Sequence, residues 1–75
     1  MYTGNYECLE LFVKPEAGKK GSVSLKKIKE NKTEIKELQH IYGNWIKFQT
    51  DKDTEYAITA QDCTITFAYL SECEN

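Results

Sequence analysis

The chain has few side chains that could carry out catalysis. His40 is its only imidazole and would have to serve as the base for any serine or cysteine nucleophile. It lies in a stretch that we predict to be helical, where an exposed histidine is the simpler interpretation. Lys19 and Lys20 precede Gly21 rather than follow it, so this loop lacks the spacing of a phosphate-binding loop. The sequence therefore predicts a protein that is not an enzyme and binds no cofactor.

The cysteines do not form a recognisable metal site. Cys8, Cys63 and Cys73 are far apart, contain no Cys-x-x-Cys pair and are accompanied by a single histidine, so no zinc ligand set is expected. We expect three reduced thiols, with Cys8 and Cys63 buried and Cys73 exposed. The first residues lack the features of a signal peptide, and no apolar run approaches the roughly 20 residues of a membrane span. These observations predict a cytoplasmic protein without a metal or a membrane partner.

The positive charges are unusual because all ten are lysines. A lysine ammonium cannot make the bidentate contacts that an arginine guanidinium makes with phosphate, carboxylate or guanine. Sequence-specific reading of guanine in DNA is therefore disfavoured. Isoleucine, asparagine, tyrosine and glutamate accompany the lysines, and AT-rich codons favour this vocabulary. We infer a low-GC bacterium, or one of its phages or mobile elements, as the source.

The charges are also divided along the chain. Residues 14–47 hold nine lysines and four glutamates, whereas residues 48–75 hold one lysine and six acidic side chains. The small formal net charge of −2 therefore conceals a basic segment followed by an acidic one. The two segments either pair with each other on folding or are displayed to partners.

These features favour a binding protein over an enzyme. Five tyrosines, three phenylalanines and one tryptophan are a rich supply of the side chains that protein interfaces prefer. We predict a protein-protein interaction module or an inhibitor, for example of a host enzyme or defence system, with a homodimer through a sheet edge as a further expectation. The predicted interface consists of Tyr42, Trp45, Asp51, Asp53, Glu55 and Tyr56.

Nucleic acid is the alternative partner. Proteins that bind single strands combine a cationic groove with aromatic side chains on which bases stack. Here the lysine-rich middle of the chain is followed by Trp45, which is available for stacking if it lies on the face of its strand opposite Ile46 and Phe48. The residues predicted for this alternative are Lys26, Lys27, Lys29 and Trp45. The acidic balance of the whole chain, with an isoelectric point near 5.3, weighs against it.

Alternating apolar residues predict five strands, at residues 6–13, 22–25, 44–50, 54–59 and 63–70. The first two are expected to form a hairpin and the last three a meander. In the last strand, Cys63, Ile65, Phe67 and Tyr69 are expected to line one face. Residues 71–75 are expected to be a frayed tail.

The segment between the second and third strands is ambiguous. Asn31 to Glu34 matches a loose capping box, Ile35 and Leu38 have helical spacing, and Gly43 could end a helix. We therefore predict a helix over about residues 33–42, while a further strand containing Ile35 and Leu38 is the competing interpretation. The predicted fold class is α+β: one small domain over residues 1–75, with a five-stranded antiparallel sheet or partly open barrel and one short helix, in the order β-β-α-β-β-β. The alternative is an all-β fold.

Overall fold

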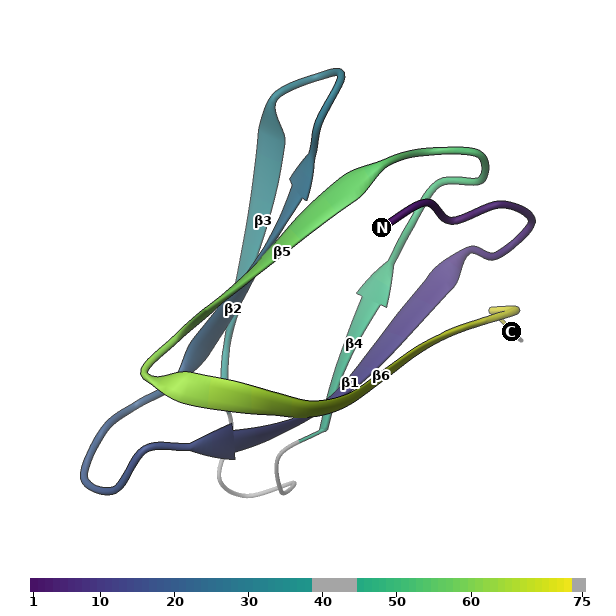
Figure 1. Ribbon diagram of the computed structural model, residues 1–75. Coiled ribbons are helices and arrows are strands. Elements are labelled where there is room, and N and C mark those ends of the chain that lie inside the picture. The colour runs from purple at the N-terminus through teal and green to yellow at the C-terminus, as the bar shows by residue number, and fades with distance from the viewer. Residues whose placement is uncertain (39–44, 74–75) are drawn as a thin grey trace.

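The chain folds into two antiparallel sheets of three strands each, and the computed structural model describes residues 1–38 and 45–73. Within these residues the strands, listed in chain order, are β1 (Cys8–Pro15), β2 (Ser22–Lys27), β3 (Lys32–Glu37), β4 (Trp45–Gln49), β5 (Tyr56–Gln61) and β6 (Cys63–Ser71). The strand order is β4-β1-β6 in one sheet and β3-β2-β5 in the other (Figure 1).

The two sheets are joined at a corner between β5 and β6. Only Asp62 separates these strands, and its φ of 56° lies in the left-handed region, which aspartate tolerates better than most residues. The chain turns here and passes from one sheet into the other (Figure 1). A strand that changes sheets at such a bend is the usual way to make the corner of a packed pair of sheets.

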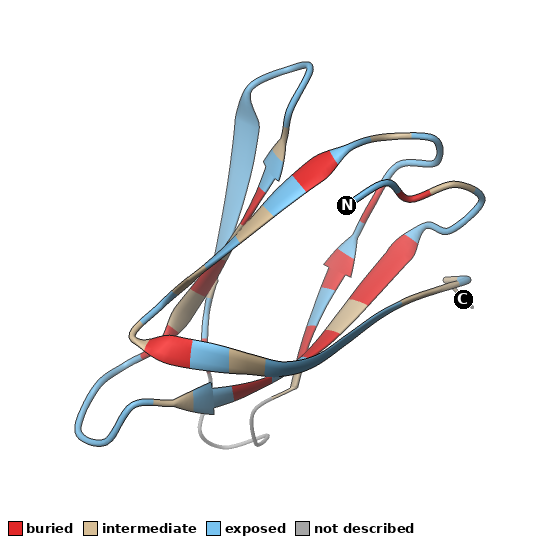
Figure 2. Ribbon diagram, in the orientation of Figure 1, coloured by how far each residue is buried: buried red, intermediate tan, exposed pale blue. Residues whose placement is uncertain are grey.

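The core lies between the two sheets and is built from strand residues at alternate positions. In β1 these are Leu9, Leu11 and Val13, each no more than 1% exposed. The other buried residues of the core, from both sheets, include Val23, Leu25, Leu38, Ile46, Phe48, Tyr56 and Cys63. Figure 2 shows this alternation on β1, β2 and β4, and shows that β3 is exposed along almost its whole length. Most of the core therefore comes from five of the six described strands.

The prediction of an α+β fold with a helix over residues 33–42 is wrong, and the all-β alternative fits. The described part of that range is strand β3, which pairs along its whole length with β2. Asn31 does not cap a helix but ends the turn between β2 and β3 with a φ of 53°. Asparagine favours both positions because its side chain can satisfy nearby backbone groups, so the capping pattern alone could not separate the two. Ile35 is 64% exposed, which shows that the helical spacing did not report burial.

The predicted strands are present, but their predicted partners are wrong. β1 and β2 do not form a hairpin, because β1 pairs with β4 and β6 while β2 pairs with β3 and β5. The last three strands do not form a meander for the same reason. Sequence alternation identifies a strand and its buried face, whereas the partner depends on contacts far along the chain.

A disulfide joins the beginning of β1 to the end of the described chain. Cys8 and Cys73 form the bond, with their Cα atoms 5.3 Å apart, within the usual range for a disulfide. The expectation of three reduced thiols is therefore wrong for this pair, while Cys63 is a free and buried cysteine. Disulfides persist in oxidising compartments and are rare in the reducing cytoplasm. The cytoplasmic placement expected from the sequence stays a prediction.

Gly21 gives a test of core packing where β2 begins. A Cβ atom at this position would lie 2.6 Å from Leu38 Cδ1 and 2.7 Å from Cys63 Cβ. We expect Gly21→Ala to lower the free energy of unfolding by about 1–3 kcal/mol through overpacking. Urea denaturation measures the change. The control Ser24→Ala, on the outer face of β2, should change stability by less than about 0.5 kcal/mol; equal effects of the two substitutions would contradict the packing described.

The Cys8–Cys73 bond gives a second test. It closes a loop with a sequence separation of 65 residues, and a disulfide that closes so long a loop restricts the unfolded chain strongly. We expect a reducing agent to lower the free energy of unfolding by about 2–4 kcal/mol. Thermal denaturation with and without the reductant measures this. The Cys73→Ser variant should be insensitive to the reductant, and an unchanged melting temperature of the wild-type chain would show that the bond does not form.

Candidate interaction surface

A β-bulge in β6 determines which of its side chains face outward. Phe12 pairs with Phe67, yet the next residue, Val13, pairs with Ile65, so Thr66 has no opposite residue on β1. The Thr66 hydroxyl donates a hydrogen bond to the Phe12 carbonyl at 3.1 Å. Because side chains alternate along a strand, one extra residue reverses the faces of everything that follows.

The bulge corrects the prediction for the last strand. Cys63 and Ile65 do point into the core, but Phe67 and Tyr69 lie on the opposite, outer face of the sheet, with exposed fractions of 56% and 38%. Leu70 returns to the core side. The single face expected for all four residues is therefore divided by the bulge.

Four aromatic side chains lie together on the outer face of the β4-β1-β6 sheet. We call this group the aromatic surface: Phe12 on β1, Trp45 on β4, and Phe67 and Tyr69 on β6. The ring centroids of Phe12 and Trp45 are 4.1 Å apart, those of Trp45 and Tyr69 5.9 Å, and those of Phe67 and Tyr69 5.5 Å. All three pairs are tilted, as aromatic pairs prefer. The rings therefore support one another while remaining partly open to solvent.

Polar groups lie next to the aromatic surface. Glu10 occupies the next outward position of β1, with Lys47 opposite it on β4 and Tyr69 opposite it on β6. The hydrogen bond of the Tyr69 hydroxyl to Glu10, with the nearby carboxylate charge, raises the pKa of Tyr69. The Ser71 hydroxyl donates a further hydrogen bond to Glu10 at 3.4 Å. Lys14 is the outward residue of β1 on the other side of Phe12. One carboxylate and two ammonium groups thus adjoin the four rings, so the surface has no strong charge of one sign.

The outer face of the other sheet is different in character. Its outward positions are mainly small or polar: Ser22, Ser24, Lys26, Thr33, Glu37, Ala57, Thr59 and Gln61. Ile35 is the one large apolar side chain among these outward positions. The two sheets therefore present contrasting outer faces, and only one of them displays aromatic side chains among the described residues.

The lysines predicted for nucleic-acid binding do not lie beside Trp45. Lys26 is on the outer face of β2, in the other sheet, and Lys29 is in the turn that follows β2. Lys27 forms ion pairs with Asp51 and with Glu30, the latter at 3.1 Å, and these carboxylates raise its pKa. The predicted combination of a lysine cluster and a tryptophan is therefore not brought together by the fold.

The residues predicted as a protein interface are also separated. Trp45 begins β4 and Asp51 follows the end of that strand, which places them about 20 Å apart at the usual rise per residue. Tyr56 is buried, and its hydroxyl accepts a hydrogen bond from the backbone N–H of Asp51 at 2.9 Å. Tyr42 lies outside the described residues.

The acidic turn between β4 and β5 is largely engaged within the molecule. Asp53 accepts a hydrogen bond from the Tyr2 hydroxyl at 3.1 Å, which raises the pKa of that tyrosine. Glu55 forms an isolated backbone bridge with Tyr2. Together with the Lys27–Asp51 ion pair, these contacts join the turn to the N-terminal residues and to β2.

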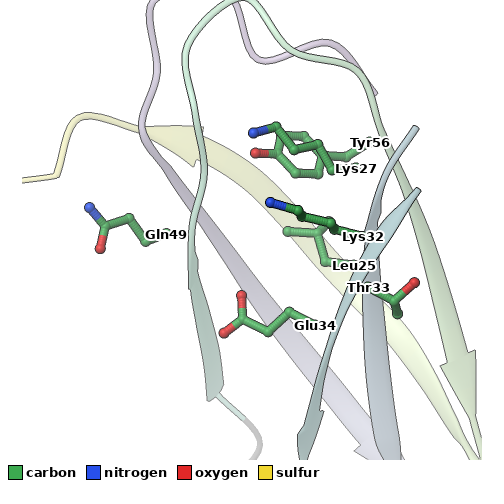
Figure 3. A pocket seen from close by; sticks show the side chains of 7 residues that line it. All are labelled: Leu25, Lys27, Lys32, Thr33, Glu34, Gln49 and Tyr56. Atoms are coloured by element: carbon green, nitrogen blue, oxygen red, sulfur yellow. The ribbon is translucent and has the colours of Figure 1, made fainter. Parts of the chain in front are cut away.

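A shallow cleft of about 180 Å³ separates the two sheets between β3 and β4. Figure 3 shows the side chains of Lys27, Lys32 and Glu34 reaching from β2 and β3 toward β4, where Gln49 lies across the gap. Leu25 and Tyr56 form the apolar part of its lining. The cleft carries charges of both signs and no described group with the geometry of a catalytic pair.

The basic and acidic segments pair only in part. Lys27–Asp51 and Lys19–Asp62 join one segment to the other, the second at 3.7 Å, and Lys52 pairs with Glu7 at 3.6 Å. These are surface pairs, which contribute little to stability. The charge division seen in the sequence is therefore bridged at two described points.

Metal-binding and nucleophilic groups are the remaining candidates for chemistry among residues 1–38 and 45–73. No group of three or more histidine, cysteine or acidic side chains there could hold a metal ion. The thiol of Cys63 is buried and donates to the Ser22 carbonyl at 3.3 Å. His40, the candidate base, lies outside the described residues. No helix in the described part of the chain is long and apolar enough to cross a membrane.

No protein-family model, curated protein or solved structure matches the chain. The candidate site therefore depends on the geometry of this molecule alone.

Sequence reasoning found one member of the aromatic surface and missed three. Trp45 was named as an interface residue, whereas Phe12 was not named as a site residue. Phe67 and Tyr69 were assigned to the same face as Cys63 and Ile65, because Thr66 carries no glycine or proline signal of a bulge. The apolar second face of β1 was the one available sign of this surface.

Tyr69 gives a prediction that depends on pH. Its raised pKa means that the folded state holds the phenolic proton more tightly than the unfolded chain. The stabilisation is therefore fully present below pH 10 and is lost as the pH rises through the folded-state pKa. The ring centroids of Trp45 and Tyr69 are 5.9 Å apart, so ionisation of the Tyr69 phenol should quench the fluorescence of Trp45. The midpoint of this quenching should lie above pH 10.0.

Two variants test the assignment of this midpoint. Glu10→Gln removes the carboxylate and should return the midpoint toward 10.0. Asp53→Asn removes the corresponding partner of Tyr2 and should leave the Trp45 signal unchanged. A midpoint that follows Asp53 rather than Glu10 would contradict the arrangement of the surface.

Proposed function

We propose that the chain is a non-catalytic module that binds another protein through the aromatic surface. The observation that carries this proposal is the gathering of four aromatic side chains from three strands on one outer sheet face. Phe12, Phe67 and Tyr69 keep between 38% and 56% of their area exposed. Contiguous apolar surface on a soluble domain commonly marks a site of interaction.

The composition of the surface fits a protein partner. Tryptophan, tyrosine and phenylalanine dominate the central positions of protein interfaces, because each supplies a large contact area with few rotatable bonds. Trp45 is already half-buried against Phe12, so a partner would meet a side chain that is held in position. Glu10 and Lys47 supply polar groups beside the rings, in the manner of an interface rim.

A nucleic-acid partner has less support. Aromatic rings can stack with bases, but single-strand binding also needs cationic groups along the path of the backbone. The outward positions beside the rings contribute only two lysines, Lys14 and Lys47, together with one acid, Glu10. Fluorescence of Trp45 in the presence of oligonucleotides, at low and high salt, separates the two functions: steeply salt-dependent quenching would favour nucleic acid and oppose our proposal.

Capture of partners from a lysate of the source cells tests the proposal. The bait is the wild-type chain, compared with Phe12→Ser and Phe67→Ser, which replace exposed rings without opening the core. The matched control is Ile35→Ser, which removes an apolar side chain of somewhat greater exposure from the other sheet. Once a captured protein is purified, we expect the aromatic variants to weaken its binding by about 30-fold, the equivalent of a 2 kcal/mol contact.

The control decides how the result is interpreted. Ile35→Ser should bind the purified partner as the wild-type chain does. Binding that survives both aromatic substitutions, or that is lost with Ile35→Ser alone, would place the interface elsewhere and refute the proposal.

A further inference from the structure

Four of the described strands are sheet edges: β3 and β5 in one sheet, β4 and β6 in the other. An edge strand carries a row of backbone N–H and C=O groups that lack a neighbouring strand and can pair with another chain. Proteins normally obstruct such edges with charges, with side chains that cap the free groups, or with a covering segment.

Three of the edges are obstructed at one or more positions. β3 has four charged side chains among its six residues. On β4, the Lys36 ammonium from β3 donates a hydrogen bond to the free carbonyl of Lys47. On β5, the Met1 amino group donates to the Tyr56 carbonyl at 2.9 Å, and the Tyr56 N–H donates to the Met1 carbonyl at 2.8 Å.

Among the described residues, β6 has no charged side chain, capping side chain or covering segment on its free edge, and the bulge at Thr66 is its one irregularity. Its nine residues, Cys63–Ser71, include no charged side chain and no proline. Residues 66–69 are all exposed, and this part of β6 is pale blue in Figure 2. The whole strand is composed largely of threonine and apolar or aromatic residues, which favour strand pairing. The free side of β6 is therefore suited to receive another strand.

The pairing pattern shows which backbone groups are free. The Thr50 N–H donates to the Glu7 carbonyl at 2.8 Å, so the backbone groups of Glu7 point toward β4. Because these directions alternate along a strand, the backbone groups of Leu9 and Leu11 point toward β4 as well. The intervening residues of β1 direct theirs toward β6, opposite Phe67, Tyr69 and Ser71. The N–H and C=O groups of Ala68 and Leu70 consequently point away from β1, toward the free edge.

We propose that β6 pairs in antiparallel fashion with β6 of a second copy of this chain. A two-fold axis at Ala68 would place its free N–H and C=O groups opposite those of Ala68 in the second copy. Thr66 would then face Leu70, and no charge would meet a like charge. An uncharged edge is self-complementary in a way that the charged edge of β3 is not.

The same axis would extend the aromatic surface across both copies. Phe67 of one copy lies opposite Tyr69 of the other, since both flank Ala68 on the outer face. The paired sheet has the order β4-β1-β6-β6-β1-β4, with eight aromatic side chains on one face. This enlarged binding surface rests on the proposed function, whereas the pairing of β6 does not.

Light scattering coupled to size-exclusion chromatography, over a range of concentrations, tests the pairing. The wild-type chain should shift from monomer to dimer as its concentration rises. Ala68→Lys should stay monomeric, because two ammonium groups would meet at the axis. Residue 68 is exposed, so its side chain can reach solvent although it lies on the same face as Leu11. The matched control, Thr59→Lys, adds the same charge at an exposed position of β5 and should dimerise as the wild-type chain does.

Hydrogen exchange locates the dimer contact. The amides of Ala68 and Leu70 should gain protection as concentration rises, while the Tyr69 amide, bonded to β1, should be protected throughout. A wild-type chain that stays monomeric, an Ala68→Lys dimer, or open-ended aggregates would each overturn the inference. Partner capture by monomeric Ala68→Lys would leave the proposed function intact, so the two failures can be told apart.

Discussion

One unpaired residue in β6 determines how this small molecule divides its aromatic side chains between inside and outside. β6 begins as a core strand, with Cys63 and Ile65 directed toward the space between the sheets. Thr66 interrupts the ladder opposite the junction of Phe12 and Val13, and the side-chain alternation resumes in the opposite phase. Phe67 and Tyr69 therefore join Trp45 and Phe12 on the outside. Without that shift the outer face would lose two of its four rings.

The bulge is held on both sides by other contacts. Toward the N-terminal end of β6, the corner at Asp62 ties the strand to β5 and so to the second sheet. Toward its C-terminal end, the Cys8–Cys73 disulfide joins the chain to the start of β1. Pairing with β1 continues between these two points. The aromatic surface therefore lies on a segment whose register is constrained at both ends, which favours a preorganised binding face.

The elements predicted correctly and those predicted wrongly differ in whether a local pattern of residues reveals them. The alternation in residues 6–13, 22–25, 44–50, 54–59 and 63–70 predicted five strands correctly, because the buried side of a strand has a period of two. It failed for residues 32–37, where β3 is exposed along nearly all its length and carries no apolar alternation. A weak helical pattern and an ambiguous asparagine then favoured the wrong element. Trp45 was recognised because of its residue type, while Phe67 and Tyr69 were missed because a bulge without glycine leaves no local sign.

The sequence by itself determined that this is a small chain with a limited core and with lysine as its only strong cation. It also determined most of the strands and their buried positions, since these depend on residue type and local spacing. The tertiary structure alone decided the pairing of the strands, the disulfide and the phase of β6 after Thr66. Each of these depends on residues far apart in the chain: Phe12 with Phe67, Cys8 with Cys73, and β1 with β4. The aromatic surface belongs to this second group, because its four rings come from three strands that meet only in the folded sheet.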